Sequence, residues 1–172
     1  MRATIALNRK MKAEVKIDFR AALIYRQAFL SDMIEDMTAL VKPDVYWTTE
    51  NIEKLFGIIW AHIKNANDGT PDYLVWKKRL PGIQAILVVR ALYGLWAIVS
   101  EPVVKTADEG RSRDDLEPSY SLYRYIARKL KIEFDEFLQM TPGELLDIAN
   151  FETKMQAEPV YTATQADYDN FF

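Results

Sequence analysis

The 172-residue sequence contains no cysteine, a single histidine and only six glycines. The absence of cysteine excludes a disulfide scaffold, a cysteine nucleophile and a thiolate metal site, and it is typical of a reducing compartment. One histidine cannot build a multi-histidine metal centre, and glycines that occur singly do not form a glycine-rich phosphate loop. We therefore expect neither a metal nor another cofactor.

Long hydrophobic runs are also missing. The most apolar stretch, Ile83 to Val99, carries Arg90 near its centre and is shorter than the roughly 20 apolar residues that span a membrane. The N-terminal apolar patch is cut short by Arg9 and Lys10, so it lacks the pattern of a signal peptide. We expect a cytoplasmic protein with no membrane partner. Because the Ile83–Val99 segment is apolar nearly all round, we also expect it to be buried centrally or against another copy of the chain.

What the sequence does contain is apolar and aromatic residues: 49% of the chain is apolar, with 4 Trp, 9 Tyr and 8 Phe. This content is too high for a disordered chain. The length suits one domain, or one domain with a small appendage. Composition therefore favours a folded globule without indicating its function.

Charge is unevenly distributed along the chain. The first 26 residues hold seven Lys and Arg against two acidic residues, a net charge of +5, so the remainder sums to −8. A basic beginning and an acidic remainder could steer a partner or another copy of the same chain. The alternative is a chance imbalance between solvated surfaces.

Hydrophobic spacing predicts a mainly α-helical fold that begins with a β-hairpin. Short alternating runs at 4–7 and 13–17 predict the hairpin. Apolar residues three and four positions apart predict a helical bundle and then a small C-terminal helical block, with a short helical turn from Phe134 to Met140. The predicted helices are 18–41, 49–66, 71–80, 83–100, 119–131 and 142–154.

Composition divides the chain into four segments. We expect a hairpin and helical domain at 1–104, a charged linker at 105–118, the C-terminal helical block at 119–155 and a flexible acidic, aromatic tail at 156–172. In the C-terminal block, Thr141, Pro142 and Glu144 have the spacing of a capping box with proline at the first helical position. We assign these three residues a structural role.

No catalytic constellation is apparent. His62 has no Ser, Asp or Glu at a spacing that makes a dyad, so we interpret it as a surface or partly buried histidine. Acidic neighbours such as Asp114 and Asp115 do not form the convergent carboxylate pair that acid–base catalysis needs. The basic run Lys77-Lys78-Arg79 has no aromatic-interleaved strand or recognition helix beside it. We expect neither an enzyme nor a nucleic-acid-binding protein.

Three segments, in order, resemble the tail assembly chaperones of long-tailed bacteriophages and prophages. Residues 17–29 (IDFRAALIYRQAF) resemble that family's strand-to-helix start, an aromatic-Arg-Ala sequence followed by Tyr-Arg/Lys-x-x-Phe. Residues 61–76 are similar to its helix, Pro-Asp-aromatic turn and Trp. Residues 137–147 (FLQMTPGELLD) resemble its Phe-x-x-Met-Thr-Pro-x-Glu motif. This chain departs from the pattern at Leu30, where relatives often have glycine.

The resemblance implies a non-enzymatic chaperone in the host cytoplasm, absent from the mature virion. The first block would bind the tape measure protein in many copies, as a homo-oligomer, and the second would recruit tail tube protein. In many relatives a programmed ribosomal frameshift joins the second block, so short and extended forms coexist. The linker at 105–118 falls where such a junction would lie.

Candidate partner-binding residues follow from this interpretation. Apolar residues in poorly periodic places could line a groove for an amphipathic helix; they are Tyr46, Trp47 and Trp76. The helix faces that the capping box orients could recruit the tube protein; they include Phe137, Leu138 and Leu145. Ordinary core packing is the alternative for the aromatic candidates. For the whole chain, the alternative is a small helical regulatory or DNA-associated protein.

Overall fold

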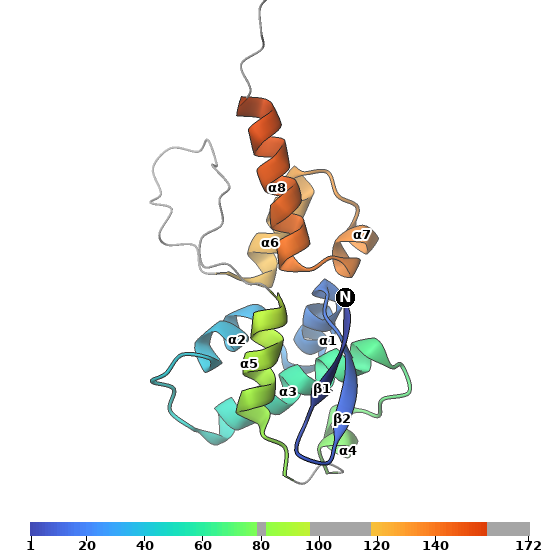
Figure 1. Ribbon diagram of the computed structural model, residues 1–172, viewed down its shortest axis with the longest axis vertical. Helices are drawn as coiled ribbons and strands as arrows, with labels where there is room; N and C mark the ends of the chain where they lie inside the picture. The colour runs from blue at the N-terminus through green and yellow to red at the C-terminus, as the bar shows by residue number, and fades with distance from the viewer. Residues whose placement is uncertain (79–81, 97–117, 158–172) are drawn as a thin grey trace, which may run out of the picture.

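The computed structural model describes residues 1–78, 82–96 and 118–157, with side chains as far as Glu152. The protein is mainly helical behind an N-terminal hairpin, so the predicted fold class is confirmed (Figure 1). The elements are β1 (Arg2–Ala6), β2 (Lys12–Lys16), α1 (Phe19–Phe29), α2 (Met33–Leu40), α3 (Thr49–Ala66), α4 (Tyr73–Lys78), α5 (Ala85–Trp96), α6 (Tyr120–Lys129), α7 (Phe134–Gln139) and α8 (Pro142–Ala157). Nearly all of the predicted linker, the end of the predicted 83–100 helix and most of the predicted tail lie outside the described residues.

The hairpin is antiparallel and turns tightly. Arg2 pairs with Lys16 and Ala6 with Lys12, while Ile5 and Val15 point into the core. At the turn, the Asn8 side-chain oxygen accepts hydrogen bonds from two successive backbone amides, at 2.8 Å each. These bonds fix the conformation of the turn.

Helix α3 lies at the centre of the N-terminal bundle and packs against β2, α1, α2 and α5. Its residues 55–62 are buried apart from Phe56. Gly57 permits the closest approach: a Cβ there would lie 2.7 Å from Phe29 Cζ and 3.0 Å from Tyr25 Cε2. Glycine therefore sits in this helix because two aromatic rings of α1 occupy the space of a side chain.

The single helix predicted over 18–41 is wrong, because the structure has two helices there. Leu30 adopts a left-handed conformation (φ 55°, ψ 27°) that ends α1, and Asp32 then caps α2 by accepting from the Ile34 and Glu35 amides. The apolar spacing continues across the break, which is why periodicity alone missed it. Glycine is the residue that adopts this conformation without strain, and this chain has leucine there instead.

We expect Leu30→Gly to stabilise the protein. A left-handed conformation costs a non-glycine residue about 1–2 kcal/mol, and Leu30 is 91% exposed, so little burial is lost. After allowing for the greater freedom of glycine in the unfolded chain, the gain should be about 0.5–1 kcal/mol. Urea unfolding of the two chains would measure it. An equal loss in Leu30→Gly would contradict the strain argument.

The N-terminal bundle and the C-terminal helices share buried contacts. The Phe19 ring stacks on Phe137, with centroids 4.3 Å apart, and also meets Trp96, Tyr120 and Tyr123. The Phe19 amide donates to the Met140 carbonyl at 3.0 Å. Asp32, which caps α2, also accepts from the Tyr120 amide at 2.9 Å. In the described residues, one hydrophobic core therefore runs through both predicted blocks.

The start of the helix predicted at 71–80 is also wrong. Helix α4 begins at Tyr73, after Asp72 accepts from the Val75 and Trp76 amides. The Thr70 hydroxyl instead donates to the Ile63 carbonyl at 3.5 Å. Pro71 lies outside the helix, where its carbonyl accepts from the Trp60 indole at 2.9 Å. This segment therefore closes the end of α3 rather than opening a long helix.

Candidate functional site

Tyr46 and Trp47 lie on the surface, in the segment between α2 and α3. Their exposed fractions are 87% and 53%. The Tyr46 carbonyl accepts from the Asn51 side chain at 2.7 Å and from the Thr48 amide at 3.1 Å, and Thr48 caps α3. The backbone is thus held in place while both rings face solvent, which leaves them available to a partner.

Trp76 is placed differently, because it is only 6% exposed. It stacks on Tyr73 with ring centroids 6.4 Å apart. Tyr73 in turn donates to the Glu53 carboxylate at 2.5 Å, and Lys77 pairs with the same carboxylate. Trp76 therefore joins α4 to the bundle and offers no surface to a partner in this conformation.

Phe137, Leu138 and Leu145 are buried as well. Among the described side chains of the C-terminal helices, the exposed large apolar ones are Tyr125, Phe134, Ile148 and Phe151, none of which was a candidate from the sequence. For α8 the sequence did contain a signal of exposed apolar residues. Five apolar residues, more than one helix face can bury, fall within seven positions: Leu145, Leu146, Ile148, Ala149 and Phe151.

Thr141 and Glu144 form the predicted capping box at the start of α8. The Thr141 amide donates to Glu144 Oε2 at 2.7 Å, and the Glu144 amide donates to the Thr141 hydroxyl at 3.3 Å. Pro142 occupies the first position of α8, where no amide hydrogen is needed. This reciprocal pair orients α8 against α6 and α7.

Thr141→Ala should lower the free energy of unfolding by about 1 kcal/mol, because it leaves the Glu144 amide without its acceptor. Thr141→Ser keeps the hydroxyl and serves as the matched control, with little change expected. Chemical denaturation of the three chains would measure both effects. Equal stability of the alanine variant and the parent would show that the cap contributes nothing.

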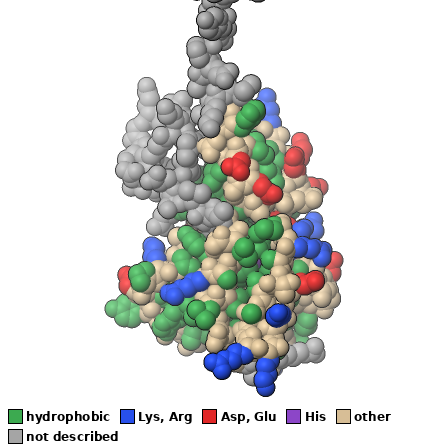
Figure 2. Space-filling view, viewed as in Figure 1, with side chains coloured by type: hydrophobic (Ala, Val, Ile, Leu, Met, Phe, Trp, Pro, Cys, Tyr) green, Lys and Arg blue, Asp and Glu red, His purple; other side chains and the backbone are tan. Residues whose placement is uncertain are grey.

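Helix α5 presents a mostly apolar face to solvent. Val88, Val89, Leu92 and Trp96 are buried, whereas Leu87, Arg90, Ala91, Gly94 and Leu95 are exposed. The exposed set has the spacing of one helix face, and we call it the α5 face. Figure 2 shows hydrophobic side chains over this region of the molecule. Its small residues, Ala91 and Gly94, would let another helix approach closely.

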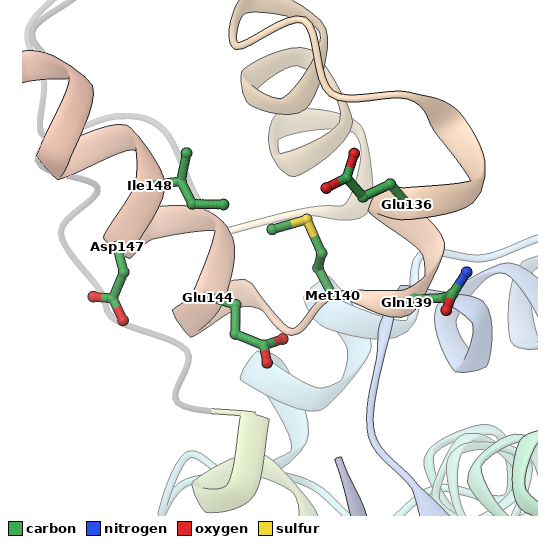
Figure 3. A pocket seen from close by; sticks show the side chains of 6 residues that line it. All are labelled: Glu136, Gln139, Met140, Glu144, Asp147 and Ile148. Atoms are coloured by element: carbon green, nitrogen blue, oxygen red, sulfur yellow. The ribbon is translucent and has the colours of Figure 1, made fainter.

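A groove of about 600 Å³ lies between α7 and α8. Figure 3 shows Met140 and Ile148 pointing toward one another across it, with Glu136 on the α7 side and Asp147 on the α8 side. Gln139 and Glu144 complete the lining. The groove therefore combines an apolar floor with an acidic rim.

His62 is wholly buried, so its interpretation as a surface or partly buried residue is corrected. Its Nε2 accepts from the Trp96 indole at 2.6 Å, which places the proton on Nδ1, where it donates to the Ile58 carbonyl at 2.7 Å. Burial lowers the pKa of the imidazole from 6.5 to about 4. Both ring nitrogens are used within the core, so this histidine is not positioned for catalysis.

Asp36 forms a second buried polar cluster. Its carboxylate accepts from Tyr25 at 2.9 Å and Ser31 at 2.6 Å, and it pairs with Lys54 at 3.0 Å. Burial, aided by this carboxylate, holds the pKa of the Tyr25 hydroxyl above its usual range. The cluster ties α1, α2 and α3 together, which is a structural role.

Neither a metal site nor a membrane-spanning helix is found in the part of the chain that the structure describes. Among the described residues, no group of His, Asp and Glu could hold a metal ion, and no helix is long and apolar enough to span a membrane. Comparison with protein-family models, curated proteins and solved structures finds no match. The family resemblance therefore depends on the motif residues alone.

Proposed function

We propose that this chain is a non-enzymatic tail assembly chaperone that binds the tape measure protein and recruits tail tube subunits. The order of the three motifs supports the family. The exposed α5 face is the observation that supports the binding role. A tape measure protein is a long helical protein. A mostly apolar helix face that carries small residues and one cation, Arg90, near its centre is suited to packing against an amphipathic helix.

The motif residues support this proposal through the fold. Phe19, Tyr25 and Phe29 pack in the core, Tyr73 joins α4 to α3, and Trp76 is buried beside it. Such residues determine how the helices are arranged rather than what they bind. We therefore assign partner binding to exposed side chains: the α5 face and Trp47 for the tape measure protein, and Phe134 and Phe151 for the tube protein.

The decisive experiment is co-expression with a tape measure protein, to be sought as a long coiled-coil protein encoded by a neighbouring gene, followed by affinity purification. We expect the long protein to become soluble and to co-purify. Leu87→Glu/Leu95→Glu should abolish co-purification, because two charges interrupt the apolar face. Leu74→Glu changes a leucine on α4 that is more exposed than either of these and should leave co-purification intact.

Failure of the long protein to co-purify, or equal co-purification by the two glutamate variants, would count against the proposal. Phe134→Ser/Phe151→Ser tests the second role, because it should abolish capture of the tube protein. Capture that survives this change would also count against the proposal. Salt-dependent binding to random duplex DNA without co-purification would instead support the regulatory alternative.

A further inference from the structure

Two groups of unpaired charge of opposite sign lie in different halves of the molecule. The first is the basic hairpin tip, defined as Arg9, Lys10 and Lys12, all of which are exposed. The second is the groove between α7 and α8. Figure 2 shows Lys and Arg gathered at the hairpin end and Asp and Glu around the C-terminal helices. Because the core holds both groups in place, they cannot meet within one molecule (Figure 1).

Neither group is neutralised internally. No ion pair among the described residues involves the hairpin tip, and the carboxylates of Glu136 and Asp147 pair with no cation there. Elsewhere in the described chain, Lys16, Lys54 and Lys77 each bind a carboxylate. The two ends therefore carry charge that is available to another molecule.

The hairpin tip is also rigid. The Asn8 side chain closes the turn, and the Leu7 carbonyl accepts from the Gln84 amide at 3.1 Å, which fastens the turn to the segment before α5. Leu7 itself is buried. Little backbone conformational entropy would therefore be lost when the tip binds.

The groove suits such a partner. Its volume, about 600 Å³, lies within the range of binding pockets. The floor formed by Met140 and Ile148 can receive the aliphatic stems of lysine or arginine. Glu136 and Asp147 supply negative charge on the α7 and α8 sides of the groove, although in Figure 3 the Asp147 carboxylate points away from the floor. Charge complementarity therefore selects a basic, rigid loop, and this chain carries one.

We infer that the groove between α7 and α8 binds the basic hairpin tip of a second copy of this chain. The contact joins two different surfaces, so each bound copy leaves one tip and one groove free. The association is then open-ended, and copies add one after another rather than closing into a symmetric dimer. The inference uses residues distinct from the α5 face and does not depend on the proposed function.

Sedimentation of the purified chain tests the inference. At low salt the weight-average mass should rise at least about twofold as the protein is concentrated toward 1 mM. Raising the salt to about 1 M, where the Debye length is about 3 Å, should return the chain to monomer. A monomer at every concentration, or a closed dimer that does not grow, would overturn the inference.

Two neutral variants locate the contact. Lys10→Gln/Lys12→Gln removes two of the three tip charges, and Glu136→Gln/Asp147→Asn removes the two groove carboxylates that take no part in the capping box. Each should stay monomeric alone. Mixed in equal amounts, they can form only one contact, between the intact groove of one and the intact tip of the other, so a heterodimer and nothing larger should appear.

Matched controls change the same charge elsewhere. Arg20→Gln/Lys42→Gln and Asp44→Asn/Asp68→Asn alter exposed residues outside both surfaces, and both should associate like the parent. Thermal melts check that all four variants are folded. Loss of association in the controls, or growth beyond a dimer in the mixture, would assign self-association to general charge or to another surface and overturn the inference.

Discussion

Replacing Phe19 by alanine should lower the free energy of unfolding by about 3–5 kcal/mol. The ring is fully buried and lies between the N-terminal bundle and the C-terminal helices, stacked on Phe137 and edge-on to Trp96. Alanine would leave a cavity where four other aromatic rings converge, and rigid rings cannot collapse into it easily. A domain of this size is stable by only about 5–15 kcal/mol, so the loss would be a large fraction of the total.

Two further variants keep this prediction measurable if the alanine variant fails to fold. Phe19→Leu keeps most of the volume and should cost about 1.5 kcal/mol. Phe151→Ala removes an exposed ring from α8 and should change stability by no more than about 0.5 kcal/mol. Urea unfolding gives the energies. Hydrogen exchange on Phe19→Leu should show faster exchange in α6 and α7, since their packing depends on this ring. Unchanged protection there would mean that the two parts do not rely on Phe19.

Secondary structure was predicted well where the apolar spacing and the residues at the helix ends indicate the same helix. Helix α3 runs from Thr49 to Ala66, the range predicted from its apolar stripe, and Thr48 caps it. The break at Leu30 was missed because α1 and α2 pack on the same core, so their apolar residues stay nearly in phase across it. Only backbone conformation distinguishes this bend from a continuous helix, and leucine gives no sign of a positive φ.

The candidate site was harder to predict, because exposure depends on tertiary packing. Trp47 and Trp76 look alike in the sequence, yet one faces solvent and the other joins α4 to the bundle. Phe137 was assigned to a binding face, but its ring is the surface on which Phe19 stacks. Such long-range pairs cannot be deduced from spacing along one helix. The groove between α7 and α8 likewise exists only once the capping box has set the direction of α8.

His62 should make the protein less stable as the pH falls from about 6.5 toward 4. The imidazole is neutral in the core, and burial lowers its pKa to about 4, against 6.5 in an unfolded chain. Between these values the unfolded chain binds a proton that the folded chain excludes, so protonation favours unfolding. The loss of stability grows to about 3 kcal/mol at pH 4. Above pH 6.5 the imidazole is neutral in both states, so it adds no pH dependence to the stability.

His62→Gln provides the control, because a neutral amide can accept from Trp96 and donate to the Ile58 carbonyl without titrating. Carboxylates also titrate near pH 4, so the measurement is the difference between the two chains in urea unfolding from pH 7.5 to 4.5. As the pH falls, the parent should lose stability relative to His62→Gln. Because this is the only histidine in the chain, its imidazole proton signal can be assigned without ambiguity. An imidazole that titrates near pH 6.5 in the folded protein would show that the ring is accessible to water and that its bond with Trp96 does not hold it in the core.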